Sequence, residues 1–330
     1  MSKKNILLVS PYSLNNYGGV QNQINLIKQL LCNQSYRVKI FAHGSDDYNN
    51  KAPIAIKFNG SKSNVSITCN KLLLEEAIEW SDIVHIHEPF IPLILWKMKT
   101  DKPIITTHHA YLNVYWCKLL KIIYGFKTKQ LSIVSVCVSV LSSKQAAALR
   151  PNPIVIPNFI VLNPDTSFNG KSKRIMFLGR DEKRKGLKIY LNSIDSFIVN
   201  KLMPTVISNR SINNIFVDSY VNISEVKKFE LLEQTLILVA PNTKQESFGV
   251  ILLEAIANGA IVIASGIPAF KNVLSNSGVY FKNRSSKNLN TVIKDTLDAD
   301  IETIWEKQYK RLLQYQSDNV LPQIIDLYNK

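Results

Sequence analysis

The sequence has few of the features that mark secreted, membrane-spanning or zinc-binding proteins. Its 330 residues contain only four cysteines, and their spacing fits neither a disulfide framework nor a zinc ribbon (Cys32, Cys69, Cys117 and Cys137). The longest apolar run, residues 131–141, is interrupted by serines and is much shorter than a membrane span of about 20 residues. Residues 1–9 lack an apolar core long enough for a signal peptide. We therefore expect a reduced, cytoplasmic location.

Acidic residues are also scarce. Asp and Glu number 25 against 40 Lys and Arg, which gives a formal net charge of +15. Such an excess suits nucleic acid, an anionic membrane surface or a phosphorylated ligand. The basic residues form neither a tail nor a repeat with aromatic residues, so we expect no nucleic-acid partner. Lys is abundant together with Asn and Ile, and an AT-rich coding bias explains the charge equally well.

Short apolar strands alternate with helical segments along the whole chain. The apolar content of 46% is ordinary for a globular protein, and the length suits two domains. The sequence predicts strands at residues 5–10, 37–42, 83–86, 104–107, 174–178, 205–208, 236–240, 260–264 and 279–281. It predicts helices at residues 20–31, 71–80, 187–200, 225–233, 250–258 and 269–275. This alternation favours two doubly wound α/β units, with a seam near residues 151–170.

The most informative segment carries Glu246 and Glu254. A predicted strand, a polar turn and a helix follow one another here, with Glu246 on the turn and Glu254 about two helical turns further along. The first backbone amides of this helix, at Ser247, Phe248 and Gly249, lack helical partners and can bind hydroxyls or phosphate. Two acidic residues in such places can also be ordinary, one complementing the helix dipole and one solvated. Small and apolar neighbours favour burial of Glu254, and a buried carboxylate requires a partner such as a ligand hydroxyl.

Histidines gather at the ends of two other predicted strands. His85 and His87 end the third strand, and His108 and His109 end the fourth, which leaves one other histidine in the chain. Ligands of doubly wound folds bind beyond the carboxyl ends of the strands, so these side chains are placed for function. Four imidazoles can hold zinc, but no spacing in the sequence requires it.

Glycines and cations mark two further strand ends. Gly18 and Gly19 open the first helix, where they allow either a tight turn or close approach of a phosphate to the backbone. Arg180, Lys183 and Lys185 follow the strand at residues 174–178 and together suit a diphosphate. A solvated charged turn is the alternative interpretation, above all for Lys183. The only Asp-x-Asp run, at residues 298–300, is expected on a late surface helix, so we predict no metal.

Four motifs together resemble family 4 retaining glycosyltransferases of the GT-B fold: Gly-Gly-Val-Gln at residues 18–21, His-Ile-His-Glu-Pro at 85–89, Phe-Leu-Gly-Arg with Arg-Lys-Gly at 177–186, and Glu-Ser-Phe-Gly with Glu-Ala at 246–255. Further short motifs at residues 10–13, 59–61, 156–158 and 269–274 are similar to the phosphatidylinositol mannosyltransferases of actinobacteria. The resemblance implies two Rossmann-like domains facing a central cleft. It places the acceptor and membrane domain at residues 1–160 and the nucleotide-sugar domain at 161–314. A C-terminal helix at about residues 315–330 crosses back to the first domain.

The resemblance also implies an activity. It is transfer of mannose from GDP-mannose to the inositol of phosphatidylinositol, with retention, at the cytoplasmic face of the membrane. No metal or cofactor takes part, because fixed cations and helix amides can meet the charge of the departing diphosphate. Two alternatives stay open. One is a related hexosyltransferase with a different nucleotide sugar or a soluble acceptor, and the other is a non-catalytic homologue that binds lipid or nucleotide.

Roles carry over from the family to matching positions only. The diphosphate is assigned to Gly19, Arg180 and Lys185, the sugar hydroxyls to Glu246, and the ribose to Glu254. His109 lines the sugar pocket, and it is grouped with Glu246, Arg180 and Lys185 as catalytic. Backbone amides at the start of the helix complete the donor side (Ser247, Phe248, Gly249 and Val250). The acceptor side is assigned to Tyr12, Gln21, Asn59, Ser61, His109 and Arg184.

Several positions depart from the family pattern. Phe90, Asn64 and Ser66 replace polar or basic residues expected on the acceptor side, and Phe159 replaces a glycine near the hinge. The glycine-rich turn that helps to frame the nucleotide base is shortened around residues 204–222. The acceptor and the base are therefore less well defined than the nucleotide sugar. Residues 115–130 mix apolar and basic side chains as an interfacial helix does, although an ordinary amphipathic core helix has a similar pattern.

Overall fold

The computed structural model describes residues 4–16, 18–58, 61–90, 94–110, 112, 114–129, 131–244 and 246–330. The chain divides into two compact units. Unit 1 comprises residues 1–158 and 321–330, and unit 2 comprises residues 159–320. Among the described residues, no helix is both long enough and apolar enough to cross a membrane.

Unit 1 is built on a parallel sheet with the strand order β3-β2-β1-β6-β7-β8-β9. Its strands are β1 (Asn5–Val9), β2 (Arg37–Ala42), β3 (Tyr48–Asn49), β6 (Ile83–His87), β7 (Ile104–His108), β8 (Ile133–Cys137) and β9 (Ile154–Val155). The central strands β6 and β7 are buried along their whole length, as expected for a parallel sheet covered on both faces. A separate antiparallel hairpin joins β4 (Ile54–Phe58) to β5 (Ser61–Val65).

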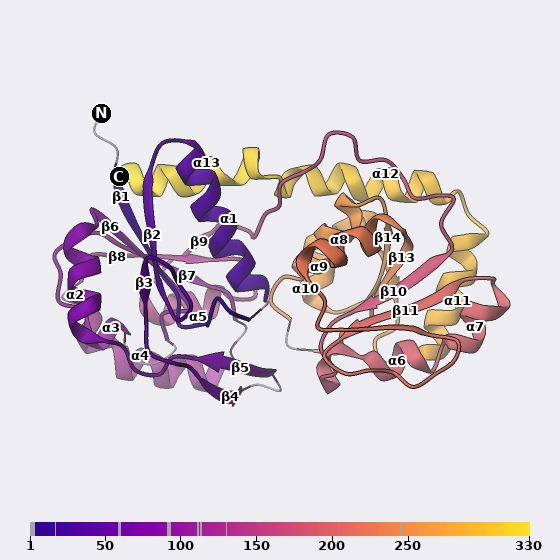
Figure 1. The fold of residues 1–330 in the computed structure, drawn as a ribbon, viewed down its shortest axis with the longest axis horizontal. Coiled ribbons are helices and arrows are strands. Elements are labelled where there is room, and N and C mark those ends of the chain that lie inside the picture. Colours follow the sequence, from indigo (N-terminus) through magenta and orange to yellow (C-terminus); the bar gives the residue numbers. More distant parts are fainter. Residues whose placement is uncertain are drawn as a thin grey trace. The chain divides into compact units, whose positions relative to one another are not determined.

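Helices cover both faces of this sheet (Figure 1). They are α1 (Gly19–Asn33), α2 (Lys71–Trp80), α3 (Ile94–Lys97), α4 (Val114–Thr128) and α5 (Ser143–Leu149). The final helix, α13 (Ser317–Asn329), ends within unit 1. Tyr328 on α13 is buried there, and its hydroxyl lies 2.7 Å from Nδ1 of His85 on β6. The end of the chain is thus part of the core of unit 1.

Unit 2 contains a second parallel sheet, with the order β12-β11-β10-β13-β14-β15. Its strands are β10 (Arg174–Leu178), β11 (Met203–Ser208), β12 (Asp218–Val221), β13 (Thr235–Ala240), β14 (Ile261–Ser265) and β15 (Val279–Phe281). Its helices are α6 (Leu187–Leu191), α7 (Ile194–Val199), α8 (Glu225–Glu233), α9 (Val250–Ala257), α10 (Pro268–Leu274), α11 (Ser286–Leu297) and α12 (Ile301–Leu312). The predicted α/β class with two parallel sheets is confirmed.

The prediction of one continuous helix at residues 187–200 is wrong. The segment forms α6 and α7 with a break between them. At the break, the Ser193 hydroxyl donates to the Ile189 carbonyl at 3.1 Å, and the Ser193 amide donates to Tyr190 O at 3.0 Å. Serine competes in this way with the regular helical ladder. The sequence also failed to predict β8, which lies inside the apolar run at residues 131–141, and the β4–β5 hairpin.

Candidate functional site

Glu246 lies at the centre of a charged cluster in unit 2. It sits in the loop between β13 and α9, at the carboxyl edge of the sheet. Its Oε2 atom accepts hydrogen bonds from Lys185 Nζ at 2.8 Å and from Asn242 Nδ2 at 2.7 Å. The Arg184 guanidinium lies 3.7 Å from the same oxygen. The structure therefore brings together three residues that were assigned separately, and it adds Asn242, whose only sequence signal is its position two residues after β13.

The electrostatics of this cluster keep Glu246 charged. Burial alone raises the pKa of its carboxyl group, but the neighbouring Lys185 and Arg184, with the hydrogen bond from Asn242, outweigh burial and hold the pKa below its usual value. Glu246 is therefore a carboxylate at neutral pH. A carboxylate is an acceptor only, which suits binding of hydroxyl groups.

Lys185 and Arg184 lie close to Glu246 because the loop after β10 is hydrogen-bonded to the loop after β13. After β10 the chain forms a short 3₁₀ helix, η1 (Lys183–Lys185), and then turns at Gly186 with φ of +75°. A Cβ atom on Gly186 would lie 2.0 Å from the Pro241 carbonyl oxygen, so only glycine fits this turn. The amide of Thr243 donates to the Arg184 carbonyl at 2.7 Å and joins the loop after β13 to η1.

Arg180 and Arg184 form a second part of the cluster with Glu182. Arg180 lies 3.2 Å from Glu182 Oε1, and its side chain is 43% exposed. The Arg184 Nε lies 2.9 Å from the other oxygen of Glu182, and its side chain is 11% exposed. Arg184, which was assigned to the acceptor side, thus lies between two carboxylates of unit 2. Its assignment stays a prediction.

The start of α9 is shaped for close backbone packing. Gly249 precedes the helix with φ of +101°, and a Cβ atom there would lie 2.7 Å from the ring of Phe270. Phe248 is buried, with its ring edge-on to Tyr315 at a centroid distance of 5.5 Å. Ser247 and Val250 flank these two residues and are partly exposed. The helix begins at Val250, so the amides of Ser247, Phe248 and Gly249, which were predicted to be its first amides, lie in the loop between Glu246 and α9.

Glu254 is held by a lysine from another helix. Lys228 on α8 donates to Glu254 Oε1 at 3.0 Å and to Glu225 Oε2 at 2.7 Å. Burial raises the pKa of Glu254, and the ammonium of Lys228 opposes this effect only in part. Glu254 is thus not a solvated helix residue. Nothing in the sequence pointed to Lys228, which lies 26 residues earlier.

In unit 1 the four histidines at the ends of β6 and β7 are buried, with His109 directly after β7. His87 Nδ1 and His109 Nε2 are 2.9 Å apart with stacked rings, and the side chain of Asn158 hydrogen-bonds His109. Burial lowers the pKa of His85, His108 and His109 to about 3, so all three are neutral at physiological pH. Within the described part of the chain, no group of His, Cys, Asp or Glu is arranged to hold a metal ion.

Gly19, which was assigned to the diphosphate, and the remaining acceptor-side positions lie in unit 1. Gly19 is the first residue of α1, and a Cβ atom added there would meet nothing within 4 Å. The Gln21 side chain donates to the Ser13 carbonyl at 3.3 Å, and Tyr12 pairs with Val65 of β5 through an isolated bridge. Ser61 begins β5, but its side chain is outside the described part of the structure. Asn59 lies outside the described residues.

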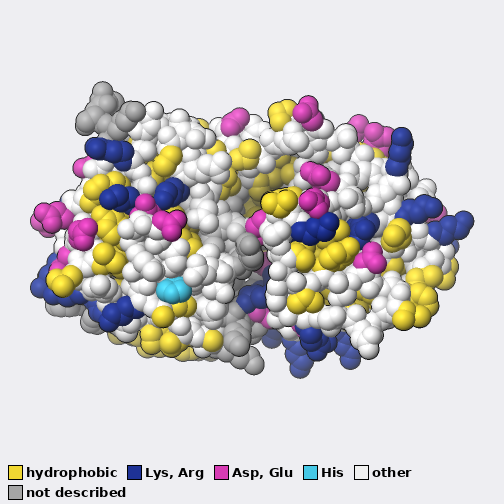
Figure 2. Space-filling model, viewed as in Figure 1, with side chains coloured by type: hydrophobic (Ala, Val, Ile, Leu, Met, Phe, Trp, Pro, Cys, Tyr) yellow, Lys and Arg dark blue, Asp and Glu magenta, His cyan; other side chains and the backbone are white. Residues whose placement is uncertain are grey.

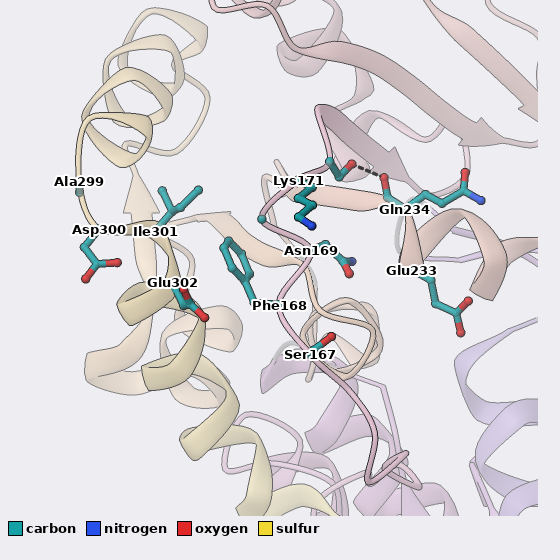
Figure 3. Close-up of a pocket in the computed structure, with 12 residues that line it drawn as sticks. Ser167, Phe168, Asn169, Lys171, Glu233, Gln234, Ala299, Asp300, Ile301 and Glu302 are labelled. Atoms are coloured by element: carbon teal, nitrogen blue, oxygen red, sulfur yellow. Dashed lines mark hydrogen bonds between the residues drawn. The ribbon is translucent and has the colours of Figure 1, made fainter.

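A cavity of about 1020 Å³ opens elsewhere in unit 2 (Figure 3). Its lining includes Ser172 just before β10 and Gln234 just before β13, so it lies at the amino edge of the sheet, away from Glu246. Two of its polar side chains, those of Asn169 and Asp300, have structural partners. The Asn169 amide donates to three backbone carbonyls, and Asp300 caps α12 through the Thr303 amide. We therefore place the functional site at the carboxyl edge.

Comparisons with known proteins indicate the kind of enzyme to which the chain is similar. Residues 205–316, which run from within β11 to just beyond α12, match the family described as Glycosyl transferases group 1. The phosphatidyl-myo-inositol mannosyltransferase of Propionibacterium freudenreichii is 26% identical over 97% of this chain and 93% of its own length. The enzyme of the same name from Mycolicibacterium smegmatis is 26% identical over 81% of this chain and 78% of its own length.

Solved structures show the same fold. A glycosyltransferase from Rickettsia africae superposes with a TM-score of 0.72 at 18% identity, over 99% of this chain and 98% of its own. Anabaena Alr3699/HepE, in complex with UDP and glucose, superposes with a TM-score of 0.68 at 13% identity, over 99% of both chains. The resemblance drawn from the motifs is thereby confirmed, and the chain is a glycosyltransferase of the GT-B fold.

Proposed function

We propose that the protein transfers mannose from GDP-mannose to the inositol of phosphatidylinositol, with retention of configuration, at the cytoplasmic face of the membrane. The names of the curated relatives support the sugar and the acceptor. The observation that carries the proposal is the ionised Glu246 held by Lys185 and Asn242 at the carboxyl edge of unit 2. This arrangement combines an acceptor for sugar hydroxyls with a cation for phosphate.

Lys185 lies beside Glu246, which is proposed to bind the sugar, and is itself proposed to bind the diphosphate. Its ammonium neutralises Glu246 in the free protein, and its side chain is 19% exposed, so it can reach an anion without leaving the site. A diphosphate beside Arg180 and Lys185 takes over this charge and frees Glu246 to accept hydrogen bonds from sugar hydroxyls. The same cations stabilise the negative charge that develops on the departing diphosphate. The amides of Ser247, Phe248 and Gly249 add neutral donors.

The proposal assigns Glu254 to the ribose of the donor and His109 to its sugar. Glu254 accepts hydrogen bonds from the ribose, while Lys228 keeps its charge compensated inside the unit. Neutral His109 donates or accepts a hydrogen bond at the sugar, because its low pKa prevents it from acting as a fixed cation. No metal or organic cofactor is required by this proposal.

The surface of α4 supports attachment to a membrane. Cys117 and Tyr124 pack into the core, and about 100° per residue places the apolar residues of the opposite face outward. These outward residues are exposed by 40–84% (Tyr115, Trp116, Leu119, Ile122 and Ile123). Lys118 and Lys121 flank them, and the helix contains no acidic residue. An apolar face bordered by lysines fits the interface of an anionic bilayer.

On the side of the molecule drawn in Figure 2, charged side chains do not mark a comparable face. Figure 2 shows Lys and Arg side chains dispersed over the visible side of both units and interleaved with Asp and Glu. We therefore assign membrane contact to α4 and not to the net charge of the chain.

A second candidate is transfer of a hexose from a uridine nucleotide. The similar Anabaena protein was solved with UDP and glucose. In this chain the segment after β11 is engaged with its neighbours: the Asp181 amide donates to Asn209 at 2.7 Å, and Arg210 lies 3.1 Å from the Asp181 carboxylate. This segment replaces the turn that was expected to frame the base, so the base must be established by experiment.

The activity test uses the purified chain with GDP-mannose or UDP-glucose, in the presence and absence of vesicles containing phosphatidylinositol. Products are identified by mass spectrometry. We expect mannosylated phosphatidylinositol from GDP-mannose only. A product from UDP-glucose supports the second candidate, and nucleotide binding without any turnover indicates the non-catalytic homologue.

The role of Glu246 is tested in the same assay. Glu246→Ala should lower kcat by about 10²–10³-fold, the range for removal of one hydrogen-bonding group that stabilises a transition state, with GDP affinity within a few-fold of the original. Glu230→Ala, on the exposed face of α8, is the matched control and should leave kcat unchanged. Loss of GDP binding in Glu246→Ala would show that Glu246 is not a sugar contact.

The membrane assignment is tested by sedimentation with vesicles of phosphatidylcholine and an anionic phospholipid. Ile122→Ser should reduce binding about tenfold or more, since each buried methylene contributes about 0.8 kcal/mol. Ile215→Ser in unit 2 removes an isoleucine that is even more exposed and should leave binding unchanged. Equal effects of the two changes would refute α4 as the contact surface.

A further inference from the structure

Glu88 has an unusual backbone conformation for its surroundings. It follows β6 directly and has φ of +53°, a region that non-glycine residues rarely adopt. Six other described non-glycine residues share a positive φ, and all of them are exposed, whereas Glu88 is 2% exposed. A strained conformation at a buried acidic residue persists only where its surroundings impose it.

The carboxylate of Glu88 holds the turn that carries His109. Its Oε1 atom accepts hydrogen bonds from the backbone amides of both His109 and Ala110. Its Oε2 atom accepts a hydrogen bond from Gln145 Nε2 at 3.0 Å. The Glu88 amide in turn donates to the Thr107 carbonyl at 2.8 Å, so the residue bridges the ends of β6 and β7.

The imidazole ring of His109 is contacted by His87, which precedes Glu88, and by Asn158. His87, the residue before Glu88, contacts His109 through Nδ1 and stacks on its ring at a centroid distance of 5.2 Å. Asn158 provides a further side-chain hydrogen bond to His109. The backbone and the imidazole of His109 are therefore fixed by two adjacent residues at the end of β6, with Asn158 completing the set.

We propose that Glu88 is a positioning residue whose carboxylate fixes the His109–Ala110 turn, so that His109 is held in one orientation at the sugar site. The groups that donate to this carboxylate in the described part of the chain are neutral amides, so the arrangement orients the turn and does not neutralise a charge. The catalytic consequence rests on the function proposed above for His109. The structural consequence, one fixed imidazole, does not.

The chain offers a substitution that separates positioning from acid–base chemistry. Glu88→Gln keeps an oxygen for the amides of His109 and Ala110 but places an NH₂ group opposite Gln145. Gln145 Oε1 is buried and has no hydrogen-bond partner among the described residues, so a flip of the Gln145 amide supplies the acceptor that the introduced NH₂ group needs. A positioning role thus predicts that Glu88→Gln keeps kcat within about threefold, with an unchanged pH profile.

The matched loss variants are Glu88→Ala and Glu88→Gly. Both remove the carboxylate, but only glycine adopts φ of +53° without strain. If the side chain fixes the turn, both should lower kcat by on the order of 10²-fold with KM for the donor little changed, the cost of a misplacement of about 1 Å. Full activity of Glu88→Gly would overturn the proposal, because relief of backbone strain would then suffice.

Nuclear magnetic resonance of ¹⁵N-histidine tests the proposal without turnover. The chain has five histidines, so the ring nitrogen signals of His109 can be assigned by His109→Gln. We expect the His109 signals to be unchanged in Glu88→Gln and shifted or broadened in Glu88→Gly. Gln145→Leu serves where Glu88→Gly does not fold, and it should cause a smaller shift in the same signals.

Three results would contradict the proposal. They are unshifted His109 signals in both Glu88→Gly and Gln145→Leu, full activity of Glu88→Gly, and loss of activity in Glu88→Gln together with one limb of the pH profile. The last result would make Glu88 an acid or base. Absence of transfer by the unsubstituted protein would refute the proposed function alone, because the imidazole signals still report on the positioning of His109.

Discussion

Replacement of Lys228 by methionine measures how much the buried ion pair between Lys228 and Glu254 contributes to the stability of unit 2. Lys228 Nζ lies 2.7 Å from Glu225 and 3.0 Å from Glu254, and its side chain is 9% exposed. Methionine keeps most of the apolar stem and removes the charge. Glu225 is 33% exposed and can turn toward water, whereas Glu254 is 14% exposed and stays in place. The substitution therefore leaves Glu254 as an unpaired buried carboxylate.

The expected cost at pH 8 is about 3 kcal/mol of unfolding free energy, at the lower end of the range for removal of one partner of a buried ion pair. Burial already raises the pKa of Glu254, and loss of Lys228 raises it further. A carboxyl group whose folded pKa exceeds the unfolded value of about 4.3 takes up its proton first in the folded state. Lowering the pH from 8 toward 5 should therefore restore part of the lost stability.

Urea unfolding followed by the fluorescence of Trp305, the one tryptophan of the sequence between residues 159 and 320, measures this cost. Lys227→Met is the control, because its ammonium pairs with Glu230 on an exposed surface and should contribute little to the unfolding free energy. The double variant Lys228→Met/Glu254→Gln should recover more than half of the loss. Equal costs for the two lysines, or a cost for Lys228→Met that does not depend on pH, would refute the reasoning.

Two further predictions concern stability at low pH and the replacement of two glycines by alanine. His85, His108 and His109 have pKa values of about 3 in the folded protein and about 6.5 in the unfolded chain, so the unfolded chain binds more protons at low pH. Below pH 6 the free energy of unfolding of unit 1 should therefore fall by about 1.4 kcal/mol per pH unit for each of these histidines. The urea midpoint of unit 1, measured as a function of pH, tests this prediction. Gly186→Ala should lower the thermal midpoint of unit 2, since φ is +75° and Pro241 O blocks a Cβ atom, whereas Gly125→Ala in α4 meets nothing within 4 Å and should stabilise by up to about 1 kcal/mol.

The proximity of Glu246 and Lys185 could be predicted from the sequence because both residues lie in loops that follow strands. Glu246 and Lys185 each lie within eight residues of a strand end, and parallel strands bring such ends to one edge. The fold class follows from the same alternation, since buried parallel strands are short and continuously apolar. The break between α6 and α7 was missed because Asn192 and Ser193 are permitted in helices and act only through local hydrogen bonds.

Side-chain contacts between residues far apart in the sequence could not be predicted. Burial of Glu254 was expected, and a ligand hydroxyl was the partner considered, but the structure supplies Lys228 from α8. Glu88 belongs to a recognised motif, yet its role depends on the amides of a turn 21 residues later. Neither pairing leaves a periodic or compositional trace. The exposed face of α4 was equally ambiguous, because a core helix and an interfacial helix share one pattern until burial is known.

The two carboxylates of unit 2 differ in how readily a ligand can reach them. Within the described part of the chain, Lys185 pairs with Glu246 alone and is 19% exposed, so an incoming anion can draw its ammonium away from that carboxylate. Lys228 is bound by Glu225 and Glu254 together and is 9% exposed, so exchange there would leave two carboxylates facing each other. We therefore expect a diphosphate to change the hydrogen bonding of Glu246 and to leave that of Glu254 as it is. Under the proposed function, this asymmetry makes Glu246 the residue whose hydrogen bonding depends on the donor being present, as expected for a group that acts on the transferred sugar and not on the nucleoside.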